Sequence, residues 1–235
     1  MSSYIHRALF WLVPAVGAAV ISSAPQALAD DVRITPDMGR AEFQIGSSDY
    51  VIERNQDKKN TIKGTFAKTS RACPPFCIHP MKAADGVETV GELEVIDFLQ
   101  NKASDGSGLL VDARIPKWHQ KGTIPGAINI PFTLFSKKNP YLGELLPALG
   151  AKRAGENKWE FSDAKELLLF CNGPWCDQSP RAINGLLAIG YPAAKLFYYR
   201  GGMQNWSLMG LSTDVPKQII VQPASDTPSK TAESQ

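Results

Sequence analysis

Short apolar runs of strand length recur along the chain, separated by polar turns and by segments with helical periodicity. Four of them occupy residues 109–111, 127–130, 167–170 and 196–199. Continuous apolar runs of this length are typical of strands that are covered on both faces, as in a parallel sheet. The first run ends in Asp112, and the third ends directly before Cys171.

Helical patterns fall between these runs. Thr89 and Glu92 have the spacing of a capping box and predict a helix that starts there. Residues 141–149 can form another helix. Ser179, followed by proline, predicts the N-cap of a third helix, which ends at Gly190. Alternating strands and helices predict an α/β fold with a parallel sheet.

The polar N-terminal part predicts a smaller structure. Residues 41–45 and 50–52 alternate between apolar and polar side chains around a turn, which predicts a small β-hairpin. A short edge strand is expected around Trp159. We therefore divide the chain into a signal peptide (1–29), an N-terminal extension with the hairpin (30–84), an α/β domain (85–215) and a disordered tail (216–235).

The N-terminus has the pattern of an export signal. A weakly basic start precedes an almost wholly apolar run from Ala8 to Ile21, and the sequence Ala27-Leu28-Ala29 supplies a small-x-small cleavage site. The apolar run is shorter than the ~20 residues that a bilayer span needs. We expect a periplasmic or secreted protein with no membrane span after cleavage.

The charge is nearly balanced, with 25 Lys and Arg against 23 Asp and Glu and a formal net charge of +2. Nothing in this composition favours a polyanionic partner, so no nucleic acid is expected. No glycine-rich phosphate loop is present, and we expect no cofactor.

Four cysteines form two close pairs, Cys73 with Cys77 and Cys171 with Cys176. Thiols in an exported protein tend to pair, and three full connectivities are open. Cys73, Cys77 and His79 can be read as part of a metal site, but a Cys73–Cys77 disulfide is favoured because the spacing and the number of ligands do not suit zinc. No metal is therefore expected.

Cys171 has the sequence context of a reactive thiol. It follows a predicted strand and precedes a loop and a helix N-terminus, and sites of α/β proteins form at the carboxyl ends of strands. Backbone N–H groups in such a loop stabilise a thiolate or a persulfide anion.

Three separated segments resemble the rhodanese family. In the first, Leu110 to Arg114 is similar to the D-x-R strand end of the family, and Thr123 to Pro131 is similar to its H-I-P-G-A-x-N-I-P motif. The second is Phe170-Cys171 with the following loop and helix, which is similar to the active-site segment of the family. The third is Gly201 to Trp206, which is similar to its closing G-G-x-x-x-W. The resemblance implies a doubly wound α/β domain in which Cys171 carries a persulfide. It also implies that residues 172–178 cradle the sulfur and that Asp112 and Arg114 support the loop from behind.

The loop departs from the family pattern. It is longer, Cys176 stands where the family has arginine, and Asp177 adds a negative charge. Thiosulfate therefore suits this loop poorly, and we expect a larger, less anionic donor. Arg181 in the following helix is a candidate replacement for the missing arginine. Thr123 replaces a histidine of the motif, a change that we interpret as structural.

The candidate site thus has Cys171 and Cys176 as catalytic residues and a set of substrate-binding residues around them. This set comprises Asn172, Gly173, Pro174, Trp175, Asp177, Gln178, Ser179 and Arg181. Cys176 can also act as a resolving thiol or form a disulfide with Cys171. His119 is expected to be exposed to solvent, and Trp206 to pack in the core.

Three functions remain open. The first is an exported sulfurtransferase that moves a sulfane sulfur from a small donor to a thiol acceptor, which can be a protein thiol. The second is a thiol-disulfide redox protein that uses Cys171 and Cys176. The third is a non-catalytic binding module in which both cysteine pairs are structural.

Overall fold

The computed structural model describes residues 32–155 and 158–216. The predicted signal peptide and most of the predicted tail lie outside these residues. The strands are β1 Arg40–Ile45, β2 Ser48–Glu53, β3 Glu88–Val90, β4 Gly108–Asp112, β5 Ile128–Asn129, β6 Lys152–Gly155, β7 Lys158–Glu160, β8 Glu166–Phe170 and β9 Leu196–Tyr199. The α-helices are α1 Glu92–Phe98, α2 Pro116–His119, α3 Leu142–Ala148, α4 Gln178–Ile189 and α5 Gly202–Leu208. The other helical turns are η1 Gly64–Ala67, η2 Leu99–Ala103, η3 Phe132–Phe135 and η4 Ala193–Lys195.

Five parallel strands form the central sheet in the order β3-β9-β8-β4-β5. The strand β8, which leads to Cys171, lies in the middle. Its side chains alternate between the two faces. Leu167 and Leu169 pack in one buried cluster with Ile183 of α4, whereas Leu168 and Phe170 pack in another with Trp206 of α5. Helices cover both faces, as the predicted doubly wound α/β fold requires.

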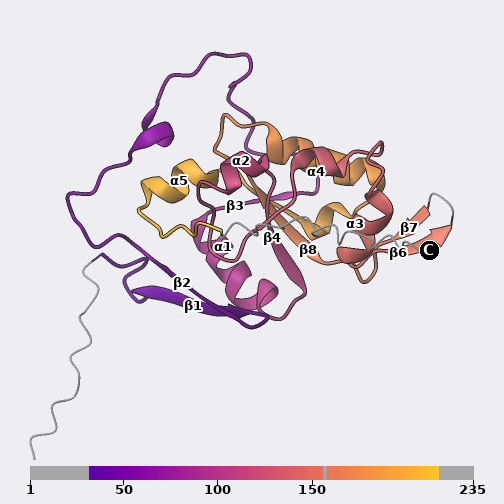
Figure 1. The fold of residues 1–235 in the computed structure, drawn as a ribbon, viewed down its shortest axis with the longest axis horizontal. Helices are drawn as coiled ribbons and strands as arrows, with labels where there is room; N and C mark the ends of the chain where they lie inside the picture. The colour runs from indigo at the N-terminus through magenta and orange to yellow at the C-terminus, as the bar shows by residue number, and fades with distance from the viewer. Residues whose placement is uncertain (1–31, 156–157, 217–235) are drawn as a thin grey trace, which may run out of the picture.

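The N-terminal hairpin predicted from the alternating pattern is present. β1 pairs with β2 in antiparallel register, and Ala41, Phe43 and Ile52 are buried. These side chains join the cluster that contains α1, which Figure 1 shows next to the hairpin and away from α3 and α4. The hairpin thus completes the core on one face of the sheet.

Two local predictions were wrong. Thr89 belongs to β3, a strand that the sequence pattern missed, and its hydroxyl donates to the Met81 carbonyl oxygen at 2.7 Å. The helix begins at Glu92, where the Glu94 carboxylate accepts the Gly91 N–H at 2.9 Å. Ser179 is not an N-cap either, because α4 begins at Gln178 after Asp177.

Trp159 lies on β7, which pairs with β6 in a separate two-stranded sheet. The edge strand expected here therefore exists but does not belong to the central sheet. In the described part of the chain, no helix is long and apolar enough to cross a membrane.

Candidate active site

Cys171 lies directly after β8, at the point where the chain leaves the middle of the sheet. Residues 171–177 form a loop that leads to α4, whose last turn ends at Gly190 in a left-handed conformation. Only 2% of Cys171 is exposed. In its protonated form the thiol donates to the carbonyl oxygen of Cys176 at 3.1 Å.

The surroundings of the Cys171 sulfur favour its thiolate. Burial alone would raise the pKa of Cys171, but hydrogen bonds from the Cys176 thiol, the Ser179 hydroxyl and the N–H groups of Ser179 and Gly173 lower it below the usual value. The Ser179 hydroxyl is buried and has no partner among the described residues while Cys171 is protonated. Ionisation of Cys171 supplies the acceptor that this hydroxyl lacks.

The surroundings of Cys176 shift its pKa in the opposite direction. Its hydrogen bond to Cys171 and its burial raise its pKa far above the usual range, because a second negative charge beside a Cys171 thiolate is unfavourable. Of the two free thiols, Cys171 is therefore the one that ionises more readily, and the Cys176 thiol donates a hydrogen bond to it.

Asp112 and Arg114 support the loop from behind. The Arg114 guanidinium donates to both carboxylate oxygens of Asp112, at 2.8 and 2.6 Å, and to the Asn172 side chain at 3.3 Å. Both charged residues are almost completely buried. Burial would raise the pKa of Asp112, but hydrogen bonds from Arg114 and His119 and the Arg114 charge lower it. The pair fixes Asn172, the residue next to Cys171.

Two neighbours of Asp112 complete this network. His119 was expected at the surface, but its Nδ1 lies 3.0 Å from Oδ2 of Asp112 and its side chain is only 13% exposed. That prediction was wrong because α2 turns the side chain back toward the strand end. The Thr123 hydroxyl donates to the same carboxylate oxygen at 2.9 Å.

The segment after β9 holds the loop from the other side. The N–H groups of Met203 and Gln204 donate to the carbonyl oxygens of Cys171 and Asn172, at 3.0 and 2.9 Å. Gly202 has a φ of 54°, and a Cβ there would lie 2.4 Å from the Cys171 carbonyl oxygen. Only glycine permits this close approach of the two backbones.

The remaining predicted substrate-binding residues occupy different surroundings. Trp175 donates through Nε1 to the Gln204 side chain, and the Pro174 carbonyl oxygen accepts the His79 N–H at 2.8 Å. Asp177 and Arg181 form an exposed ion pair at 3.6 Å, and the Arg181 guanidinium lies over Phe132. The structure gives Arg181 no contact with Cys171, so it does not replace the missing arginine of the loop.

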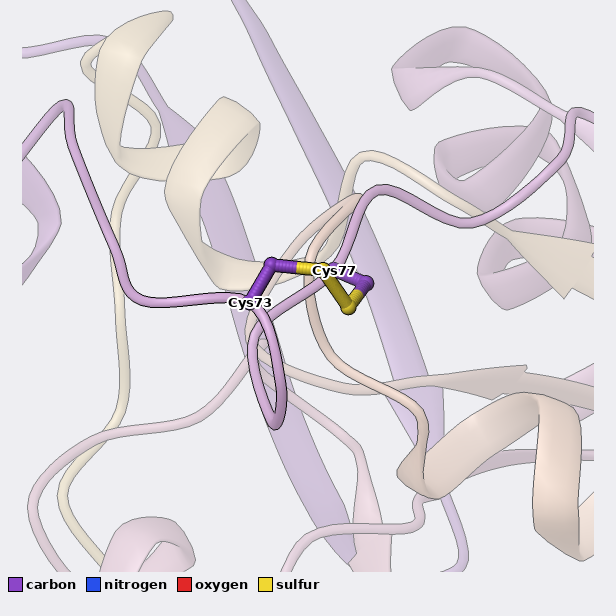
Figure 2. Close-up of a disulfide and its surroundings, with 2 residues drawn as sticks. All are labelled: Cys73 and Cys77. Atoms are coloured by element: carbon purple, nitrogen blue, oxygen red, sulfur yellow. A yellow bond between two sulfur atoms is a disulfide. The ribbon is translucent and has the colours of Figure 1, made fainter.

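The N-terminal extension reaches this site. Figure 1 shows the segment between β2 and β3 as a long loop around α5, and the His79–Pro174 hydrogen bond joins it to the Cys171 loop. Within this segment a disulfide joins Cys73 and Cys77, whose Cα atoms are 4.6 Å apart, and closes the narrow turn drawn in Figure 2. Residues 32–155 and 158–216 contain no cluster of three metal-ligating side chains.

Sequence reasoning missed several residues of the site. Arg71 stacks on Trp175, with its guanidinium carbon 3.7 Å from the ring centroid. The buried Tyr198 hydroxyl has no partner in the described part of the chain, and a Cys171 thiolate adds to the rise in its pKa that burial causes. Gln204 lies inside the G-G-x-x-x-W segment, which pointed to its position. Nothing in the local pattern singled out Arg71 or Tyr198.

The fold and the site define an α/β domain with a cysteine at the end of the middle strand, cradled before a helix N-terminus. Residues 95–209 match the family model described as Rhodanese-like domain. This part of the chain accordingly resembles a rhodanese-like domain in sequence and has the corresponding α/β fold.

A curated protein with a similar segment is the HTH-type transcriptional regulator Rv0324 of Mycobacterium tuberculosis (strain ATCC 25618 / H37Rv). It is 29% identical over 116 residues, which are 49% of this chain and 42% of that protein. The chain therefore spans less than half the length of this relative.

Similar solved structures share about a fifth of their residues with this chain. The human single-domain sulfurtransferase TSTD1 is 22% identical, with a TM-score of 0.35, and the match covers 52% of this chain and 96% of that one. The As-Sb reductase from Leishmania major is 21% identical, with a TM-score of 0.38, and the match covers 52% of this chain and 78% of that one. A thiosulfate sulfurtransferase from Pseudomonas aeruginosa is 21% identical, with a TM-score of 0.36, and the match covers 55% of this chain and 20% of that one. At these TM-scores the matches carry no weight for function.

Proposed function

We propose that the protein is an exported sulfurtransferase in which Cys171 carries a sulfane sulfur as a persulfide. The observation that carries this proposal is the set of donors around the Cys171 sulfur, which includes the otherwise unpartnered Ser179 hydroxyl. These donors stabilise an anionic sulfur at a buried position. A thiolate and a persulfide both have that character.

The transfer needs two nucleophilic steps. The Cys171 thiolate attacks the sulfane sulfur of the donor, and the rest of the donor leaves with the electron pair of the broken bond. A thiolate acceptor then attacks the terminal sulfur of the persulfide, and Cys171 leaves as a thiolate. Neither step requires an external oxidant or reductant, because the sulfane sulfur passes from one thiolate to another.

Export is proposed from the N-terminal pattern and from one bond in the extension. The apolar run and the small-x-small site are typical of a secretory signal. The Cys73–Cys77 disulfide is a bond that oxidising compartments maintain. Periplasmic or secreted protein isolated from the native cells should begin at Asp30, whereas retention of residues 1–29 would contradict export by cleavage.

A second candidate function is thiol-disulfide exchange by Cys171 and Cys176. One observation favours it: both cysteines are free, and the Cys176 thiol is hydrogen-bonded to Cys171. The raised pKa of Cys176 opposes a role as the attacking thiol while Cys171 is a thiolate. Sulfur transfer through Cys171 alone is therefore the better-supported function.

Intact mass spectrometry separates these functions. The mature protein is incubated with a polysulfide or an aromatic thiosulfonate, desalted and weighed, together with Cys171→Ser and Cys176→Ser. Sulfur transfer predicts the gain of one sulfur atom by the unsubstituted protein and by Cys176→Ser, but not by Cys171→Ser. A redox protein would instead lose two hydrogens through an internal disulfide. An unreactive Cys171 would favour a binding module.

A further inference from the structure

A groove of about 990 Å³ lies beside the Cys171 loop. One wall is the segment from Ile62 to Ile78 in the extension, and the opposite wall consists of Pro174 and Trp175 of the loop together with Gln204 of α5. The backbone N–H of Gln204 donates to Asn172, the residue next to Cys171, at 2.9 Å. The groove therefore comes within a few residues of the nucleophile.

Much of the groove surface is apolar. Phe66 and Phe76 of the extension face it together with Leu208 of α5. Phe76 also contacts Trp175 edge to face, with the ring centroids 5.7 Å apart. Walls of this kind bury the hydrocarbon body of a small organic molecule.

The charged side chains that line the groove are Arg71 and Arg200. Arg71 stacks on Trp175 and donates through Nη2 to the Thr65 carbonyl oxygen at 2.7 Å, and its buried Nε has no partner among the described residues. Arg200 is held by the carbonyl oxygens of His79 and Pro80.

The part of the chain that the structure describes provides no acidic partner for these two charges. Within residues 32–155 and 158–216, neither arginine forms an ion pair, and no Asp or Glu lines the groove. Arg71 and Arg200 thus leave a positive charge beside an apolar surface. An anion bound here would be stabilised by charge-assisted hydrogen bonds to a planar guanidinium.

We infer that this groove binds the organic sulfur substrate, and that this substrate is a small thiol or persulfide with an apolar body and a negatively charged group. Arg71 and Arg200, which line the same groove, bind the charge, and Trp175 and Phe76 contact the body. The inference rests on the proposed sulfurtransferase function for the identity of the reacting group. It assigns to the extension the cationic role that the Cys171 loop lacks.

Cys171 itself does not line the groove, so the sulfur end of the substrate must reach it through the loop. Trp175 and its hydrogen bond to Gln204 form the boundary. Arg71 stacks on the Trp175 ring through its face, whereas an anion binds at the N–H edge, so Arg71 can bind the charge of the substrate without leaving Trp175.

Binding is measured first with an analogue that has no transferable sulfur. Isothermal titration of the mature protein should show a higher affinity for 4-(methylthio)benzoate than for its neutral methyl ester. Arg71→Gln should weaken binding of the acid roughly tenfold, as expected for the loss of a hydrogen bond to a charged group, and should leave that of the ester unchanged. Arg71→Lys, which keeps the charge, should retain part of the affinity.

Arg153→Gln is the matched control. Arg153 also lies over a tryptophan, Trp159, at 5.2 Å, but on the hairpin of β6 and β7 and outside the groove. This variant should bind both compounds as the unsubstituted protein does. Equal affinity for acid and ester, no binding of the acid, or an Arg71→Gln variant with full affinity would each overturn the inference.

Turnover then tests the substrate class. With 4-mercaptobenzoate as acceptor, Arg71→Gln should raise KM with little change in kcat. With methyl 4-mercaptobenzoate as acceptor, the KM of Arg71→Gln should equal that of the unsubstituted protein. Unchanged alkylation of Cys171 shows that the variant is folded. If Cys171 never gains sulfur, the proposed function fails, but the titration still decides whether the groove binds the anion.

Discussion

The Arg114 guanidinium faces the Asp112 carboxylate in a two-pronged geometry, with Nε–Oδ1 and Nη2–Oδ2 distances of 2.8 and 2.6 Å. Both side chains are buried at the end of β4, beside the residue that follows Cys171. The pair links the stability of the domain to the shape of the site. Removal of either partner leaves an uncompensated charge without water.

Asp112→Asn should therefore lower the free energy of unfolding by about 3–5 kcal/mol, the usual cost of breaking a buried pair. Urea denaturation measures this loss. The exposed Lys152–Asp163 pair is the control, and Asp163→Asn should have little effect because water screens that contact. Equal losses for the two variants would contradict the role assigned to Asp112.

Acid should weaken the fold through the same carboxylate. Because the pKa of Asp112 is lower in the folded chain than its usual value, its contribution is fully present above about pH 4 and is lost as the pH falls through the lowered pKa. Urea midpoints between about pH 6 and about pH 2 should fall less steeply for Asp112→Asn than for the unsubstituted protein. Parallel curves would show that other carboxylates control acid unfolding.

Ser179→Ala should make Cys171 less reactive. The hydroxyl helps to lower the pKa of Cys171, so its loss reduces the thiolate fraction at neutral pH. Alkylation by iodoacetamide should slow roughly tenfold, the effect of losing one hydrogen bond to a charged group. Mass spectrometry gives the rate of alkylation at Cys171. The control is Ser162→Ala, at an exposed serine outside the site, in which Cys171 should be alkylated at the rate of the unsubstituted protein. If the rate of Cys171 alkylation depended on pH in the same way in Ser179→Ala and in the unsubstituted protein, Ser179 would not belong to the set of donors.

Gly202→Ala should disrupt the site more than a comparable substitution elsewhere. Gly46, in the turn between β1 and β2, has a similar φ of 60° but has no atom within 4 Å of an added Cβ. Gly46→Ala should therefore cost only the ~1–2 kcal/mol of a left-handed residue. Gly202→Ala adds a clash with the Cys171 carbonyl, so urea denaturation should show a larger loss, and Cys171 alkylation should change. Equal losses would show that the loop gives way without strain.

Local patterns predicted the parts of the domain whose conformation depends on nearby residues. The apolar runs before Asp112 and Cys171 became β4 and β8, because strands covered on both faces are apolar throughout. Gly190 ended α4 as expected. β3 escaped detection, because a three-residue strand has too short a pattern and exists only through its pairing with β9.

By itself, the sequence determined that Cys171 follows a strand of a parallel α/β sheet and precedes a loop and a helix, because strand periodicity, loop composition and helix start are all local signals. Only the tertiary structure decided what surrounds that cysteine. His119 turns inward to Asp112, Ser179 faces Cys171, and Arg71 stacks on Trp175 across about a hundred residues of chain. Such contacts depend on the path of an aperiodic segment over the finished domain, and no local spacing encodes that path.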